Sequence, residues 1–316
     1  MFQYGFEETA AAVHLWCEKD GKRKSEARLL TASGANLCGF SVDGVEYLVP
    51  PPPAGSDNRH FGTPVLYPFP GVIKDRKFTF DGVDYSFEPN RGEVFRHGYV
   101  SDQKFEGSQP EVLEDGICLR TWIEIRQEHP LFTVFPVENR LDLHFTLKPD
   151  SLLINFLGTN LDSRNRFPFG FGLHPYLNII GPRETVSVTV PMKKWMNLDS
   201  GELLDPSVGP ADFRKPFSLA GLDIDAVWWG MEPEQPHSVR FHSVQKQFKA
   251  VASGIFTHSV TYCPGKSNFF CLENWTCSPN APNFAANGKA EASHLTILDP
   301  GTSASGSVMY IIEDID

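Results

Sequence analysis

The chain has 316 residues, of which 41% are hydrophobic and 12% aromatic, enough to form a substantial core. Its net charge of −11 and lack of a basic run argue against nucleic acid and anionic membranes as partners, because clustered Lys and Arg side chains bind both. No signal peptide is recognised at the start, and no apolar run of about 18 residues predicts a membrane span. We therefore expect a cytoplasmic protein whose six cysteines are reduced.

Alternating apolar residues predict strands along most of the chain. Segments 39–49 and 76–87 each predict a hairpin, because Asp43-Gly44 and Asp81-Gly82 accept the positive φ angles of a tight turn. A third hairpin is expected over 140–160, with its turn at Pro149-Asp150. Further strands are predicted at 117–125, 185–190, 294–298 and 307–313.

Turn signals recur at short intervals, and no helical period extends over a dozen residues. This pattern predicts an all-β fold, a large antiparallel sandwich, rather than βαβ units. Segments 51–62 and 190–216 are predicted as long irregular loops, where binding residues tend to lie. No repeat or shift in composition marks a boundary, so residues 1–316 are expected to form one domain. The exposed edge strands of such a sandwich could pair with those of a second copy, so a homodimer is one possible assembly.

Three stretches place an ionisable side chain among stiff or aromatic neighbours. They contain His97 in "FRHGYV", His174 in "FPFGFGLHPYLN" and Glu273 in "CLENWTCSPNAPN". Asp225, close to two tryptophans in "LDIDAVWWG", is a weaker fourth candidate. Each also has a structural interpretation, as a hydrogen-bonded core histidine, a strand-end carboxylate or a turn residue. Taken separately, none of them indicates an active site.

In their order along the chain, these blocks resemble the galactose mutarotase-like superfamily, specifically the aldose 1-epimerases. The resemblance runs from about "GANLCGF" to "YIIE", and its most specific parts are "GLHPY" and "ENWTC" with the Pro, Ala and Asn that follow. It implies a large antiparallel β-supersandwich with a sugar bound in an open groove on one sheet. It also implies that neither a metal nor an organic cofactor takes part.

The resemblance further implies roles for three residues, with Glu273 as the base, His174 as the acid and His97 as the second histidine that holds the sugar. The chemistry agrees, because interconverting α and β anomers requires removal of the proton from the C1 hydroxyl and protonation of the ring oxygen. A carboxylate suits the first task, and a histidine near its ordinary pKa of about 6.5 suits the second.

The resemblance also extends to substrate binding. Asp225, or Asp223 in an alternative alignment, matches a carboxylate that anchors sugar hydroxyls. An aromatic wall at Tyr176 or Trp275 would favour the apolar face of a pyranose.

One departure from the family pattern concerns a cation. Members commonly carry Asn-Arg after "PFP", where this chain has Gly71 and Val72. In a continuous strand Val72, Lys74 and Arg76 share one face, so Lys74 or Arg76 is expected to replace the arginine. Three hypotheses result: epimerisation of a free hexose, epimerisation of a hexose 6-phosphate held by Arg96 and these two cations, and sugar binding without catalysis.

Overall fold

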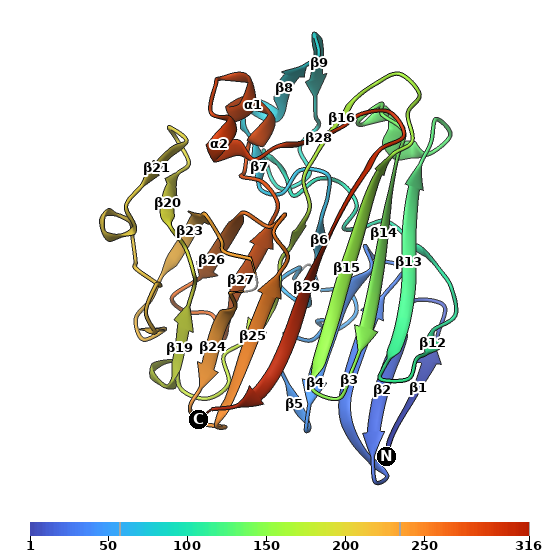
Figure 1. Ribbon diagram of the computed structural model, residues 1–316, viewed down its shortest axis with the longest axis vertical. Helices are drawn as coiled ribbons and strands as arrows, with labels where there is room; N and C mark the ends of the chain where they lie inside the picture. Colours follow the sequence, from blue (N-terminus) through green and yellow to red (C-terminus); the bar gives the residue numbers. More distant parts are fainter. Residues whose placement is uncertain (57, 234, 316) are drawn as a thin grey trace.

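The computed structural model describes residues 1–56, 58–233 and 235–315. Its strands pair antiparallel, and most of them lie in three large sheets (Figure 1). The five-stranded sheet has the order β1-β2-β3-β4-β5, with β1 Phe2–Glu8, β2 Val13–Lys19, β3 Lys22–Leu30, β4 Asn36–Val42 and β5 Val45–Glu46.

The ten-stranded sheet has the order β11-β13-β14-β15-β29-β25-β24-β19-β22, and β12 also pairs with β13. Its strands are β11 Glu106–Gly107, β12 Glu111–Val112, β13 Ile117–Ile125, β14 Asn139–Leu147, β15 Ser151–Asn160, β19 Val186–Thr189, β22 Phe217–Ser218, β24 His237–Phe241, β25 Lys246–Ala252 and β29 Ser303–Asp314.

The eight-stranded sheet has the order β21-β20-β23-β26-β27-β17-β6, and β18 also pairs with β27. Its strands are β6 Val65–Leu66, β17 Gly172–Leu173, β18 Tyr176–Asn178, β20 Lys194–Asn197, β21 Glu202–Leu204, β23 Ile224–Trp229, β26 His258–Cys263 and β27 Phe269–Trp275.

Smaller elements lie together at the top of Figure 1. They are the pairs β7 Val72–Ile73 with β10 Phe95–Arg96, β8 Lys77–Phe80 with β9 Val83–Ser86, and β16 Phe167–Phe169 with β28 Thr296–Leu298, together with the short helices α1 Ala281–Ala286 and α2 Ala290–Ser293. Of the helices in the described part of the chain, none has the length and apolar character needed to cross a membrane.

The core is built by strand alternation. In β14 the side chains of Leu141, Leu143, Phe145 and Leu147 point the same way and are at most 1% exposed. Inward-facing residues of all three large sheets join one hydrophobic cluster, which extends along the chain from Val13 to Ile312. Burial on this scale is the dominant stabilising term in folding, and it confirms the all-β sandwich predicted from the alternation.

Two hairpin predictions are confirmed residue by residue. Asp43-Gly44 joins β4 to β5 and Asp81-Gly82 joins β8 to β9, and all four residues have positive φ, as a two-residue turn requires. The prediction of one long loop over 190–216 was wrong. This segment contains the hairpin of β20 and β21, which extends the eight-stranded sheet. Its alternation is short and broken by Gly and Pro, so the local pattern was too weak to reveal it.

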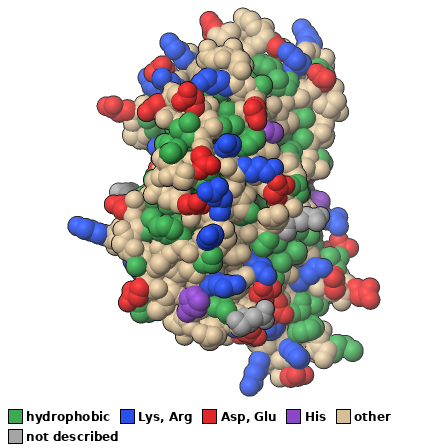
Figure 2. All heavy atoms as spheres, turned by 60° about the vertical axis from the view of Figure 1, so that its left-hand side comes forward, with side chains coloured by type: hydrophobic (Ala, Val, Ile, Leu, Met, Phe, Trp, Pro, Cys, Tyr) green, Lys and Arg blue, Asp and Glu red, His purple; other side chains and the backbone are tan. Residues whose placement is uncertain are grey.

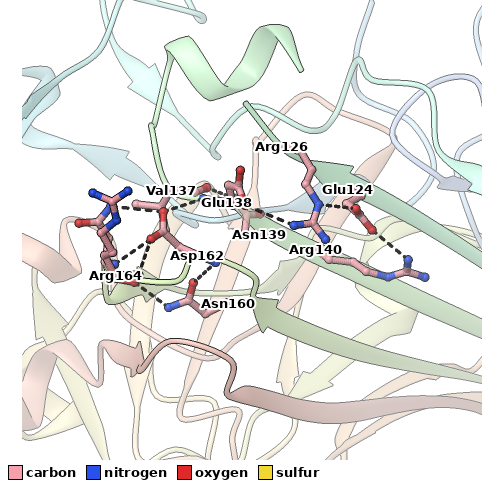
Figure 3. Close-up of polar contacts among 10 residues, drawn as sticks. Glu124, Arg126, Val137, Glu138, Asn139, Arg140, Asn160, Asp162 and Arg164 are labelled. Carbon is pink, nitrogen blue, oxygen red and sulfur yellow. Dashed lines mark hydrogen bonds and ion pairs between the residues drawn. The ribbon is translucent and has the colours of Figure 1, made fainter. Parts of the chain in front are cut away.

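A polar network closes the turn that follows β15 (Figure 3). The carboxylate of Asp162 accepts hydrogen bonds from the backbone N–H groups of Arg164 at 2.9 Å and Asn165 at 2.8 Å. The Asn160 side chain accepts one from the backbone N–H of Asp162 at 3.0 Å. Ion pairs join the neighbouring side chains of Glu124, Arg126, Glu138 and Arg140. Because the chain next forms β16 and β17, this network positions its entry into the eight-stranded sheet.

Candidate active site

The register of the eight-stranded sheet places His174 opposite Glu273. Leu173 of β17 pairs with Asn274, and Tyr176 of β18 pairs with Cys271. Both pairs belong to one unbroken antiparallel register, in which position 174 faces position 273. Pro175 interrupts the ladder, because it has no N–H to donate. The backbone N–H of His174 instead donates to the carbonyl oxygen of Pro64 on the other side, at 3.1 Å.

The same register gathers further side chains on this face of the sheet. One row across the strands contains Tyr176, Cys271, Tyr262 and Asp225. The adjacent row contains His174 and Glu273, and Trp275 lies two residues further along β27. The alternate residues, such as Leu173, Leu272 and Trp228, point the opposite way into the main core. The sheet therefore presents one face to the core and the other to this cluster.

The imidazole and the carboxylate are in direct contact. His174 Nε2 lies 3.3 Å from Glu273 Oε1. The indole N–H of Trp275 donates to Glu273 Oε2 at 2.9 Å, which fixes the orientation of the carboxyl group. His174 is 7% exposed and Glu273 1%, so the pair has little contact with water. Among the described residues, His174 Nδ1 is buried without a hydrogen-bond partner.

His97 reaches the pair from a different part of the chain. It follows β10 with a φ of 66°, and its ring lies edge-on to the rings of His174 and Trp275, with centroids 5.3 and 5.9 Å apart. The Gly71 N–H donates to His97 Nδ1 at 3.2 Å, which orients the ring. Gly98 is required here, because its φ is 70° and a Cβ would lie 2.0 Å from the carbonyl oxygen of Tyr67.

Burial shifts the two pKa values in opposite directions. It raises the pKa of Glu273 well above its ordinary value, against the opposing effects of the Trp275 N–H and Arg96. It lowers the pKa of His174 to about 3, aided by the positive charges of Arg96 and Arg91. The sequence-based expectation of a histidine near its ordinary pKa was therefore wrong, because a buried imidazolium loses its hydration. Burial also keeps the pKa of His97 well below its ordinary value.

Neither cation expected to replace the missing arginine shares a strand face with Val72. The strand β7 ends at Ile73, and a 3₁₀ turn over Lys74–Arg76 with positive φ at Asp75 and Arg76 breaks the alternation on which that expectation depended. Lys74 lines a separate groove of about 680 Å³. The described residues that line it come from 74–86, 198–200 and 280–289, not from the strands that carry His174 and Glu273.

Arg96 is the candidate to replace the arginine that the family carries at the position of Val72. It pairs directly with Val72 across the β7–β10 ladder, so its side chain reaches the site from the neighbouring strand. Its charge acts on Glu273, His174, His97 and Asp225. Arg91 also acts on both histidines and on Tyr176. Among the described residues, neither arginine forms an ion pair with a carboxylate, although the Arg91 guanidinium donates a hydrogen bond to the Ser101 hydroxyl at 3.4 Å.

Two further predicted residues, Tyr176 and Asp225, lie on the same sheet face as His174 and Glu273. The Tyr176 ring stacks on the His174 ring with centroids 4.5 Å apart, and the His60 ring lies against Tyr176 at 5.4 Å. Asp225 has an exposed side chain, yet surrounding protein removes enough of its water to raise its pKa, against the opposing charge of Arg96. The alternative, Asp223, lies directly before β23, and its carboxylate accepts a hydrogen bond from the backbone N–H of Gly265 at 3.2 Å.

Comparison with known proteins adds a family to this geometry. The profile of the aldose 1-epimerase family matches residues 22–310. The chain belongs to the aldose 1-epimerase family. It is 24% identical over 260 residues to the uncharacterized protein YphB of Escherichia coli, a match that covers 78% of this chain and 82% of YphB.

Solved structures share the fold of this aldose 1-epimerase family member. A galactose mutarotase-like protein from Clostridium acetobutylicum superposes with a TM-score of 0.84 at 20% identity, over 99% of both chains. Galactose 1-epimerase from Lactobacillus acidophilus superposes with a TM-score of 0.78 at 13% identity, over 100% of this chain and 99% of the other. The mutarotase-like supersandwich predicted from the sequence blocks is thus confirmed.

Sequence reasoning found most of this cluster but missed part of it. Glu273, His174, His97, Tyr176 and Trp275 come together, and Asp225 lies on the same sheet face. Cys271 could have been found, because it is two residues before Glu273 on the same strand and must share its face. Arg91 and His60 carry no such local signal, since loops bring them to the site.

Proposed function

We propose that this protein is an aldose 1-epimerase that interconverts the α and β anomers of a free hexose or a closely related sugar. The observation that carries the proposal is the contact of His174 Nε2 with Glu273 Oε1 at 3.3 Å. The anomeric carbon bears the hydroxyl and the ring oxygen side by side, so an acid and a base that are themselves adjacent can serve both oxygens at once.

The reaction needs one proton on the pair. Glu273 removes the proton from the C1 hydroxyl, the C1=O bond forms, and the bond between C1 and the ring oxygen breaks with its electrons moving to that oxygen. His174 donates its proton to the ring oxygen at the same time. Rotation about the C1–C2 bond and reversal of these steps give the other anomer. Burial disfavours charge on either group, so in the empty site the shared proton rests preferentially on Glu273. In this proposal that proton moves to His174 when the sugar binds, which gives the carboxylate base and the imidazolium acid that the reaction uses.

The other residues hold the sugar in this proposal. His97 and Arg96 donate hydrogen bonds toward the ring side of the sugar, and Asp225 accepts from its hydroxyls. Trp275 and Tyr176 offer aromatic surface to its apolar face. Trp275 has a second task, because its indole N–H keeps one carboxyl oxygen of Glu273 occupied and directs the other toward His174.

Polarimetry of freshly dissolved α-D-glucose and α-D-galactose tests the proposal, with the spontaneous rate subtracted. We expect Glu273→Gln and His174→Asn each to lower kcat by at least about 10²-fold, the usual contribution of a positioned acid or base. Glu106→Gln, which changes an exposed carboxylate on β11, should retain full activity. A wild-type rate no greater than the blank would reject catalysis on these sugars. Intrinsic tryptophan fluorescence that still responds to sugar would then identify a binding protein.

A second candidate is epimerisation of a hexose 6-phosphate, and the two arginines without carboxylate partners favour it. Figure 2 brings the side of β20, β21 and β23 forward and shows several Lys and Arg side chains in the middle of this face, with Asp and Glu side chains among them. Guanidinium groups bind phosphate through two parallel hydrogen bonds.

Comparing glucose 6-phosphate with glucose distinguishes the two candidates. If phosphate is recognised, Arg91→Ala should lower kcat/KM for glucose 6-phosphate by about 10- to 100-fold and change the value for glucose little, since a hydrogen bond to a charged group contributes about 1.5–3 kcal/mol. Lys74→Ala is the matched control, because Lys74 lines the other groove. A wild-type preference for glucose would reject the phosphate candidate.

A further inference from the structure

Cys271 adds a thiol to the acid–base pair. It is fully buried on β27, two residues before Glu273 and directly across from Tyr176. One donor atom from each of Cys271, Glu273 and His174 can be chosen so that all three lie within 4.8 Å of one another. Within the described residues, these three form a group of His, Cys and acidic side chains close enough together to hold a metal ion.

The donor types suit a particular class of cation. Thiolate, imidazole and carboxylate together are typical ligands of Zn²⁺ and related borderline-soft ions. In a tetrahedral site with bonds of about 2.0–2.3 Å, neighbouring donors lie about 3.5 Å apart. His174 and Glu273 already meet this spacing at 3.3 Å, and the Cys271 side chain supplies a third donor within 4.8 Å of both residues.

The surroundings favour such a site. The Trp275 N–H holds Glu273 Oε2, so Oε1 is left facing the cluster, as an oriented ligand requires. His174 Nδ1 is buried and unpartnered among the described residues, so protein contacts do not occupy both ring nitrogens. Three protein ligands leave a fourth position that a water molecule can fill.

We propose that Cys271, His174 and Glu273 bind one zinc-class divalent ion, and that the bound ion blocks the sugar reaction by occupying the acid–base pair. On binding, the Cys271 sulfur and a Glu273 carboxylate oxygen form bonds to the ion, and both the thiol proton and the proton held on Glu273 pass to solvent. The binding step stands independently of the proposed function, whereas the inhibition rests on it. Cys271 has no role in the sugar chemistry, so its replacement separates metal binding from catalysis.

Binding is tested with CdCl₂, because a Cd²⁺–thiolate bond produces an ultraviolet charge-transfer band. Protein freed of metal with EDTA should develop this band with one Cd²⁺ per chain. Cys271→Ser should abolish the band, and His174→Asn should weaken Cd²⁺ affinity at least about tenfold. Cys277→Ser is the matched control, because Cys277 is equally buried but lies outside the cluster. Circular dichroism verifies that each variant is folded. No band in the wild type, or an undiminished band in folded Cys271→Ser, would overturn the site.

Inhibition is tested with ZnCl₂ in the mutarotation assay. Zn²⁺ should slow the wild type, EDTA should restore the rate, and Cys271→Ser should need at least about tenfold more Zn²⁺ for half-inhibition. If the wild type is active but Zn²⁺ inhibits it and Cys271→Ser equally, the inhibitory role is wrong while the proposed function stands. If no sugar is turned over, the proposed function fails, and the Cd²⁺ titration still decides the site.

Discussion

Glu273 and His174 titrate as one unit, since their reacting atoms are 3.3 Å apart and both are buried. Only the form with one shared proton contains both an acid and a base. A second proton removes the base, and loss of the shared proton removes the acid. Because burial lowers the pKa of His174 to about 3 and raises that of Glu273, the one-proton form extends over a wide pH range.

The pH dependence of kcat/KM follows from these directions. We expect a plateau from about pH 5 to about pH 7, with the acid limb nearer the lowered pKa of about 3 than the ordinary histidine value of about 6.5. The measurement is polarimetry in EDTA-containing buffers, with the spontaneous rate subtracted at each pH. A tenfold fall between pH 7 and pH 5 would show instead that His174 titrates as an ordinary histidine.

At the scale of elements, the turn between β15 and β16 determines how the chain reaches the site. Burial alone would raise the pKa of Asp162, but hydrogen bonds from the backbone N–H groups of Asn165 and Arg164 hold it below the ordinary value of 3.8 (Figure 3). A carboxyl group whose folded-state pKa is lowered stabilises the fold above its unfolded pKa. That contribution is lost as the pH falls through the folded-state value.

Asp162→Ala should therefore lower the free energy of unfolding by about 2 kcal/mol at neutral pH, because buried backbone donors lose a charged acceptor. Urea titrations at several pH values measure this. The difference from wild type should shrink as the pH falls below about 4 and through the lowered folded-state pKa, where the wild-type carboxyl takes up its proton. Asp162→Asn, which keeps one acceptor oxygen, should lose less stability than the alanine variant. A difference that does not change with pH would contradict this account of the turn.

At the scale of the whole molecule, one hydrophobic cluster joins strands from all three large sheets. Removing one sheet would expose the apolar faces of the others, so we expect the sheets to unfold together, as a single domain over residues 1–316 would. Far-ultraviolet circular dichroism and tryptophan fluorescence should give the same urea midpoint, the usual test of a cooperative transition. Two separated midpoints would indicate independent units.

The sequence by itself determined many of the strands, the Asp-Gly hairpins and the blocks around His97, His174 and Glu273. These are local properties, set by period-two alternation and by the turn preferences of a few residues. Even the shared face of Cys271, Glu273 and Trp275 follows from counting along one strand.

Only the tertiary structure decided which side chains from other parts of the chain contact His174 and Glu273. The register between β17 and β27 places His174 against Glu273, and the β7–β10 ladder makes Arg96, rather than Lys74 or Arg76, the cation beside the pair. Burial then moved the pKa of His174 far from its ordinary value. The physical reason is that register, burial and electrostatic field arise from contacts between segments distant in the chain, which no local pattern encodes.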